Sequence, residues 1–410
     1  MRRYSYMMCI VIWMAGCRKP YNPPAITAPG SYLVVEGVIN NGVDSTVIKL
    51  SRTVNLSSKV VTNPVGGAML TVEGDDNSVY PLTETARGHY MSPGINLDGT
   101  RKYRLRIKTS NDQYLSDFVP VLNSPPIDSI SYAIRNNGIN IYSGTHDPTN
   151  NTHYYRWDYQ ETWIIHSNYY SFYKSNGDSV IARDMVNDQV YQCWQSDTSS
   201  VIILASSANL ANDVIVNNPV TFIDPATGKL GGRNSIIIGQ AAASANAYSI
   251  LLKQYALTGD AYTFWANLKT NTEKLGSIFD AQPSSVSGNI HSINNPAEIV
   301  IGYISAGSIA SKRIFIANGQ IPNTMSVTVN PECQLDSFYY YYIPPGYFLP
   351  LNQEDEYFNY NSGTLYGGVK YVPIAAIFSN IGAVRGHTGS TEPCVDCTLR
   401  GTNKEPAFWR

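Results

Sequence analysis

The sequence predicts a mainly β protein: an N-terminal antiparallel β-sandwich of Ig-like type, followed by a larger β-rich domain with one long helix near 258–275. Three observations carry this prediction. Apolar and polar residues alternate with a period of two from Ser31 onward. Turn formers and tyrosine are frequent, with 31 Gly, 23 Pro and 30 Tyr. Only one segment has helical spacing of its apolar residues.

Composition limits the kinds of partner that the chain can have. The 410 residues are 43% hydrophobic, enough for two or three domains with a substantial core. Charged residues make up only 15%, and the net charge is −2. A nucleic-acid-binding surface needs a clustered basic excess, so we expect no nucleic-acid partner.

The N-terminus, "MRRYSYMMCIVIWMAGCRKP", predicts a lipoprotein signal over residues 1–16. Two arginines precede an apolar stretch that is too short to span a bilayer. Small residues then stand directly before Cys17, the predicted lipidation site. The alternatives are an ordinary signal peptide and a hydrophobic N-terminus that is no signal. The lipid on Cys17 would anchor the protein to a membrane. An aspartate directly after the lipidated cysteine often retains lipoproteins in the inner membrane. Because Arg18 stands at this position instead, the outer membrane is favoured.

Residues 17–30 form a lipidated tether, and the first domain follows at 31–124. The tether ends in "PYNPPAITAPG", whose four prolines indicate a stiff extended segment. Seven short strands separated by turn signals then predict the sandwich: 32–40, 45–51, 68–74, 78–83, 88–93, 102–109 and 114–121.

The segment "NSPPIDS" at 123–129 resembles a hinge into a second domain, 125–410. In "HYYRWDYQETWII", Tyr155, Trp157 and Tyr159 alternate with polar residues, which predicts an aromatic face on one strand. The helix has Thr258 as a candidate N-cap and Gly276 as a candidate C-cap, with Trp265 expected against a sheet. We expect further strands in "SIIIGQ", "YSILLKQYAL", "EIVIGYISAG" and "SKRIFIA", and a long loop over 331–365.

No catalytic motif stands out, so we expect no enzyme, cofactor or metal. The six histidines form no zinc-binding pair, and the nucleophile elbow and phosphate-binding loops are missing from the sequence. The acidic trio Glu354, Asp355 and Glu356 is interpreted as a solvated loop.

Two tyrosine-rich stretches, "NYYSFYK" and "FYYYYIPPGYF", are candidates for a recognition surface for a glycan or a peptide. The alternative is ordinary packing, since tyrosine is a common strand residue. The candidate residues are Tyr169, Tyr170, Tyr173, Tyr339, Tyr340, Tyr341 and Tyr347.

Four cysteines besides Cys17 remain after processing: Cys193, Cys333, Cys394 and Cys397. In an oxidising compartment they predict structural disulfides, with three possible pairings. A zinc site and a redox pair are the alternatives. The C-terminal tail is then expected to be a disulfide-bonded end that docks through Phe408 and Trp409.

Several motifs in order resemble one family: "YLVVEGVIN", "IKLSRT", "YRWDYQETW", "CW" at Cys193, the long segment "QYALTGDAYTFWANLKTNTEKLGSIFDAQPSSVSGNI", "EIVIGYISAGSIASKRIFI" and "CVDC…GTNKEPAFW". The chain resembles Bacteroidota-type outer-membrane lipoproteins known as domain of unknown function 4249. The resemblance implies an outer-membrane lipoprotein, often encoded beside a TonB-dependent transporter, and it brings no catalytic residue. Arg18 and Lys19 replace the acidic residues that often follow the cysteine in surface-exposed lipoproteins, which leaves the cell surface and the periplasmic face both open.

These observations together predict an accessory or ligand-binding subunit of a TonB-dependent β-barrel transporter, acting in nutrient uptake. The main alternative is a structural or assembly scaffold lipoprotein of the outer membrane without a small ligand. A third hypothesis is an enzyme of unrecognised type, such as a glycan or peptide hydrolase.

Overall fold

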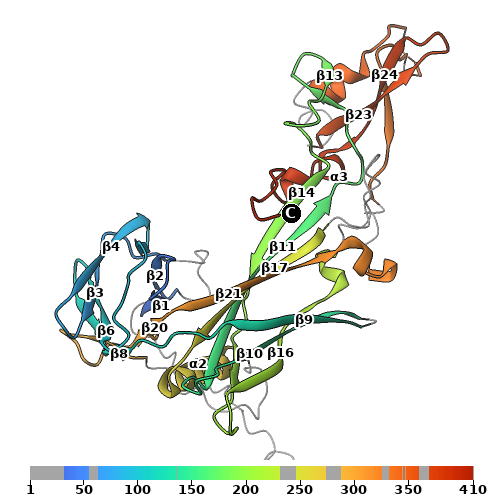
Figure 1. The fold of residues 1–410 in the computed structure, drawn as a ribbon. Coiled ribbons are helices and arrows are strands. Elements are labelled where there is room, and N and C mark those ends of the chain that lie inside the picture. The colour runs from blue at the N-terminus through green and yellow to red at the C-terminus, as the bar shows by residue number, and fades with distance from the viewer. Residues whose placement is uncertain are drawn as a thin grey trace, which may run out of the picture.

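The computed structural model describes residues 32–54, 63–135, 137–230, 246–273, 288–325, 332–343, 345–346, 348–359 and 369–409. The predicted signal, Cys17 and the tether lie outside these residues. The protein is mainly β, as predicted, and Figure 1 shows three parts. An N-terminal sandwich lies beside a central pair of sheets, and a smaller distal sheet stands at the end of the central strands.

The N-terminal part confirms the predicted series of short strands. They are β1 (Leu33–Asn40), β2 (Thr46–Arg52), β3 (Met69–Gly74), β4 (Val79–Ala86), β5 (His89–Ser92), β6 (Lys102–Lys108), β7 (Gln113–Ser116) and β8 (Val119–Pro120). These strands pair antiparallel with one another. Strand β4 joins the two halves, because residues 79–82 pair with β3 and residues 83–86 pair with β5. Alternate side chains fill one shared core.

A later segment of the chain completes this sandwich. Strands β18 (Ile290–Ser292), β19 (Val300–Ile301) and β20 (Ala306–Gly307) come from beyond the predicted boundary at 124/125. Strand β18 pairs with β7 at one end of the sheet, and β19 pairs with β1 at the other. One short segment therefore covers both open edges and nearly closes the sheet.

Two glycines allow this segment to close on itself. A Cβ at Gly288 would lie 1.5 Å from the carbonyl oxygen of Gly302. Gly302 has a φ of +147°, and a Cβ there would lie 2.2 Å from the carbonyl oxygen of Val35 on β1. Only residues without a side chain fit this approach of three backbones.

The central part consists of two packed sheets. One contains β9 (Ile127–Arg135), β10 (Gly138–His146) and β16 (Val214–Ile223). The other contains β11 (Tyr154–His166), β14 (Gln192–Thr198), β15 (Ile203–Ser206), β17 (Asn246–Ala256) and β21 (Ile309–Ala317). The aromatic face predicted for β11 is confirmed, because Tyr155 and Trp157 are fully buried between the two sheets and Tyr159 packs beside them.

The predicted hinge at 123–129 is bound to this core by one amide. The side chain of Gln254 on β17 is fully buried and accepts a hydrogen bond from the Trp157 indole (2.9 Å). Its amide nitrogen donates to the Pro125 carbonyl (2.8 Å) and to the Thr145 hydroxyl (3.0 Å). Because every polar atom of this amide has a partner, the network fixes how the chain enters the central part.

The long helix is confirmed as α2 (Gly259–Glu273). Thr258 caps it as predicted, since its hydroxyl accepts a hydrogen bond from the Ala261 amide (3.2 Å). The candidate C-cap Gly276 and the strand predicted at 235–240 lie outside the described residues. Ala261 and Phe264, rather than Trp265, are the buried residues of α2.

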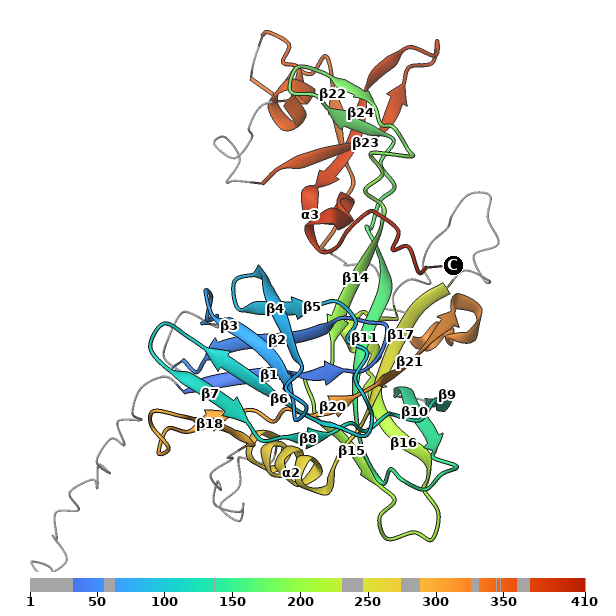
Figure 2. The same cartoon turned by 60° about the vertical axis from the view of Figure 1, so that its left-hand side comes forward.

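The distal part contains a three-stranded sheet and a small hairpin. The sheet has β22 (Asp336–Tyr339), β24 (Val384–Thr391) and β23 (Tyr371–Phe378), and the hairpin has β12 (Tyr173–Ser175) and β13 (Val180–Ala182). Figures 1 and 2 show the sheet at the opposite end of the molecule from β16 and α2. The long loop predicted over 331–365 is wrong in part, because β22 and a π-helix at Asp355–Asn359 lie within it.

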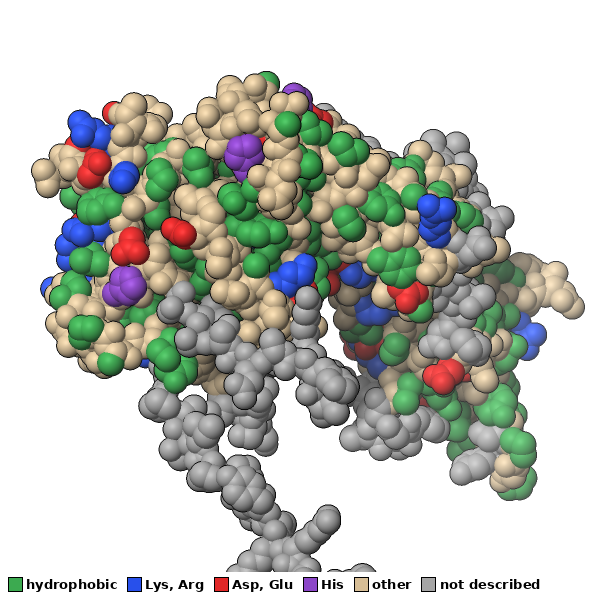
Figure 3. All heavy atoms as spheres, turned by 90° about the horizontal axis from the view of Figure 1, so that it is seen from below, with side chains coloured by type: hydrophobic (Ala, Val, Ile, Leu, Met, Phe, Trp, Pro, Cys, Tyr) green, Lys and Arg blue, Asp and Glu red, His purple; other side chains and the backbone are tan. Residues whose placement is uncertain are grey.

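Short helical turns complete the described structure: η1 (Pro225–Thr227), η3 (Asn318–Gln320), η4 (Asn323–Met325), η5 (Asp355–Asn359), α3 (Glu392–Val395) and η7 (Cys397–Leu399). Among the described residues, each helix falls short of the length and apolar character needed to cross a membrane. Over the sandwich, at the left of Figure 3, basic side chains lie among acidic ones. This mixture agrees with the near balance of charge in the sequence.

Candidate functional site

The six candidate tyrosines that the structure describes lie in or beside the distal part but divide into two groups. Tyr169 is partly buried and donates a hydrogen bond to the Cys333 carbonyl (2.9 Å), and Tyr173 packs edge-on against His387 (4.4 Å between ring centres). Tyr170 is exposed and stacks with two other aromatic rings. Tyr169 and Tyr173 therefore have packing roles, as the alternative interpretation predicts.

Tyr339, Tyr340 and Tyr341 continue from β22 to the outer end of the distal sheet. Tyr339 is partly buried, with the Arg385 guanidinium 5.9 Å from its ring centre. Tyr340 is partly exposed, and the Tyr341 side chain is 67% exposed. Tyr347 lies outside the described residues. The described residues of this stretch are thus exposed from Tyr340 onward, after β22 ends.

We define the tip loops as residues 340–343, 345–346, 348–351 and 378–384, which lie at the same end of the distal sheet. The Tyr340 amide donates to the Arg385 carbonyl (2.9 Å), which joins the first loop to the start of β24. Phe348 is 96% exposed and Ile381 is 91% exposed, and Leu349, Phe378 and Ile343 are exposed as well. Soluble proteins rarely expose such a concentration of large apolar side chains, so the tip loops have the character of a contact surface.

The interpretation of Glu354 as part of a solvated loop is wrong. Glu354 is 1% exposed, and one of its carboxylate oxygens lies 2.6 Å from Nδ1 of His387, which is 3% exposed. Burial raises the pKa of the neighbouring Tyr340 hydroxyl, and Glu354 raises it further. The carboxylate turns inward because His387, 33 residues later, offers a partner that local sequence does not reveal.

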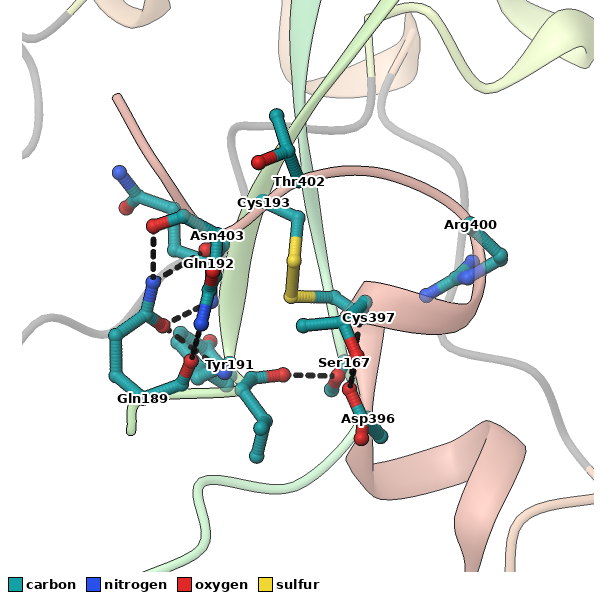
Figure 4. The surroundings of a disulfide bond; sticks show 12 residues. Ser167, Gln189, Tyr191, Gln192, Cys193, Asp396, Cys397, Arg400, Thr402 and Asn403 are labelled. Carbon is teal, nitrogen blue, oxygen red and sulfur yellow. Dashed lines mark hydrogen bonds between the residues drawn. A yellow bond between two sulfur atoms is a disulfide. The ribbon is translucent and has the colours of Figure 1, made fainter. Parts of the chain in front are cut away.

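The four cysteines form two disulfides, Cys193–Cys397 and Cys333–Cys394, so the structural-disulfide prediction is confirmed. Figure 4 shows Cys397 bonded to the start of β14 in a dense polar setting. Gln189 donates to the Gln192 carbonyl (2.7 Å), and Asn403 donates to the Gln189 carbonyl (2.8 Å). The two neighbouring cysteines of the tail therefore bind two different parts of the molecule, the distal sheet and the central sheet.

The C-terminal tail docks as predicted. Trp409 is buried against Trp194, with 6.4 Å between ring centres. The Arg313 guanidinium lies 3.6 Å from the Phe408 ring centre, and the Trp194 amide donates to the Thr402 carbonyl (2.8 Å). The tail thus packs against the central sheet and forms one β-bridge with it, between Trp194 and Thr402.

A cleft of about 990 Å³, which we call the interlobe cleft, separates the sandwich from the central part. Strands β1 and β2 form one wall, and β11, β17 and β21 form the other. Helix α2 and residues 199–202 also line it. Its volume is at the upper end of the roughly 300–1,000 Å³ typical of ligand sites. The cleft was not predicted, because two lobes remote in sequence create it.

Arg156 is the central polar residue of the interlobe cleft. Its guanidinium lies between the rings of Tyr255 (4.4 Å) and Trp265 (4.3 Å) and binds the Asp158 carboxylate (3.2 Å). Burial raises the pKa of the Tyr255 hydroxyl, and the Asp158 charge raises it further. The alternation in "YRWDY" already placed Arg156 and Asp158 together on the face opposite the aromatic core, but it did not indicate that this face lines a cleft.

The helix wall of the interlobe cleft is held by reciprocal contacts. Lys269 donates to the Ile202 carbonyl (2.6 Å), and Glu273 accepts a hydrogen bond from the Ile202 amide (2.7 Å). These two bonds connect α2 to the loop at 199–202 and keep Trp265 beside Arg156.

The fold and the cleft define a class: a disulfide-bonded, mainly β protein with an N-terminal sandwich, a central pair of packed sheets and a projecting distal sheet. Residues 18–313 match the family described as Domain of unknown function (DUF4249). The chain therefore belongs to this family, as the sequence motifs indicated. The match ends before the cysteine-containing tail, and no curated protein matches the chain.

Proposed function

We propose that this protein is an outer-membrane lipoprotein, anchored through lipid on Cys17, that serves as an accessory or ligand-binding subunit of a TonB-dependent transporter in nutrient uptake. The tip loops are the observation that carries the proposal. They expose Tyr341, Phe348 and Ile381 at the end of a sheet that projects away from the rest of the molecule. Aromatic and aliphatic side chains of this kind are typical anchors of protein–protein interfaces.

The attachment of the distal sheet also supports a docking role. Cys394 is bonded to Cys333 within the distal part, and Cys397 is bonded to Cys193 on the central sheet. Only two residues, Val395 and Asp396, separate the two disulfide-bonded cysteines of the tail, which restricts the movement of the distal sheet relative to the central sheet. A restrained surface loses less conformational entropy on binding than a mobile one.

The test is a pull-down from native outer membranes in mild detergent, with a tag after Arg410, followed by mass spectrometry. We expect a transporter barrel in near-equal amount to the protein. The variant Tyr341→Ser/Phe348→Ser/Ile381→Ser should recover at least tenfold less barrel. These side chains are exposed, so the replacement should leave the fold intact.

The matched control is Val43→Ser/Met69→Ser, which removes exposed apolar side chains from the sandwich and should retain the barrel. Recovery of a barrel-assembly machine instead would support the scaffold alternative. Recovery of the protein alone, or equal recovery of the barrel by both variants, would reject the proposal.

A further inference from the structure

Each wall of the interlobe cleft carries one acid and one base directly opposite each other on neighbouring strands. Glu36 on β1 faces Lys49 on β2, and Asp158 on β11 faces Lys253 on β17. Within the described part of the chain, Glu36, Lys49 and Lys253 form no ion pair within 4.0 Å. Their charged groups are exposed and therefore available to a ligand.

The charges of the cleft cancel. The lining contains the acids Glu36, Asp44 and Asp158 and the bases Lys49, Arg156 and Lys253. A polyanion or polycation would meet as many like charges as opposite ones, so the lining favours a ligand without net charge. A purely apolar ligand would leave these charged groups desolvated and unpaired, which is costly.

Most of the lining comes from the faces of sheets, and the edge strand β21 contributes Ile309 and Ser311. Strand β1 has partners on both sides, and β11 and β17 lie inside their sheet. An extended peptide gains much of its affinity by adding a strand to a free edge, which these strands do not offer. The cleft therefore favours recognition through side chains.

Aromatic and hydroxyl groups complete the lining. Tyr255 and Trp265 hold the Arg156 guanidinium between them, which keeps its remaining donors in a fixed position. Ser45 and Ser311 lie on opposite walls. Carboxylates accept hydrogen bonds and ammonium groups donate them, and a sugar hydroxyl does both at once.

We propose that the interlobe cleft binds a neutral oligosaccharide. Its hydroxyls bridge the two acid–base pairs, and its apolar ring faces contact Tyr255 and Trp265. This proposal adds the class of ligand to the proposed function. It rests on that function only in treating the ligand as a nutrient. Binding is a property of the purified protein, so it is measured without a transporter.

The experiment is isothermal titration calorimetry on the full chain in detergent, with both disulfides intact. The probes are neutral hexaoses of glucose, mannose and xylose, with hexagalacturonate and a Gly-Ser hexapeptide for comparison. We expect at least one neutral hexaose to bind with a Kd of about 1 mM or tighter, and the two comparison probes to bind at least tenfold more weakly.

Two variants locate the binding. Trp265→Ala should weaken it at least tenfold, and Lys253→Gln, which changes only an exposed side chain, should weaken it at least threefold. Tyr341→Ser in the tip loops is the matched control and should bind normally. Failure of every neutral hexaose to bind, preference for a comparison probe, or normal binding by both cleft variants would overturn the inference. Binding of a hexaose without recovery of a barrel would reject the proposed function and leave this inference standing.

Discussion

At the scale of single residues, His166 shows how burial controls a titratable group. It ends β11, and its ring packs against Tyr191 with 5.0 Å between ring centres. Burial lowers the pKa of His166 to about 4, although a hydrogen bond with Gln192 opposes the shift. Its Nδ1 is buried without a hydrogen-bond partner among the described residues, so the neutral ring is favoured.

We predict that His166 makes the fold sensitive to mild acid. The unfolded chain binds a proton near pH 6.5 and the folded protein only near pH 4, so the free energy of unfolding should fall as the pH drops between these values. His166→Phe keeps a ring but cannot titrate, and should show a shallower dependence in urea unfolding from pH 7 to 4. His89→Phe, on the exposed surface of β5, should keep the wild-type slope, and equal slopes for all three proteins would contradict the prediction.

Residue patterns predicted which side chains of a strand face the core better than they predicted contacts between distant parts of the chain. The period of two in β11 correctly placed Tyr155 and Trp157 in the core. The burial of Glu354 could not be predicted, because its partner His387 lies on β24, 33 residues later in the chain. The tyrosines likewise looked equivalent in sequence, but tertiary packing buries Tyr169 and exposes Tyr341.

At the scale of elements, the short tail between Cys394 and Cys397 connects two sheets. Sequence composition predicted disulfides, and the three pairings stayed open because pairing depends on where the chain places Cys193 and Cys333. The structure shows that neighbouring cysteines serve different elements. Each disulfide should therefore stabilise its own part of the molecule.

We predict separate effects for the two disulfides. Cys193→Ser/Cys397→Ser should lower the free energy of unfolding by about 2–5 kcal/mol and increase hydrogen exchange in β14 and in residues 400–409. Cys333→Ser/Cys394→Ser should increase exchange in β22 and β24 instead. Mass spectrometry of exchange in both variants checks this, and identical exchange maps would refute it.

At the scale of the whole molecule, the predicted boundary at 124/125 assigns all later residues to the second domain, but some later strands join the first sandwich. Residues 290–307 add β18, β19 and β20 to the first sandwich. The sequence predicted a strand over 298–307, where β19 and β20 lie, but it did not predict β18 or indicate which sheet these short, partly parallel strands join. The interlobe cleft was unpredictable for a related reason, since its two walls come from segments that are far apart in the sequence.

We predict that Gln254 determines how well the lobes stay together. Gln254→Leu keeps most of the volume but leaves the Trp157 indole and the Pro125 carbonyl without their partner, which should cost about 2–3 kcal/mol of unfolding free energy. Chemical denaturation gives this value. Gln160→Leu, on the exposed side of β11, is the matched control and should change stability by less than about 0.5 kcal/mol. A loss as small as that of the control would show that the amide network is dispensable.

The closing of the sandwich by residues 288–307 also sets an order of events in biosynthesis. When the first 120 residues have been made, β1 and β7 still lack the strands that cover them, and about 170 further residues must follow before those strands exist. The nascent first lobe therefore has two uncovered sheet edges for a long interval, and uncovered edges favour aggregation. A truncated chain ending before residue 288 should regain a native first lobe when a peptide of residues 288–307 is supplied in trans.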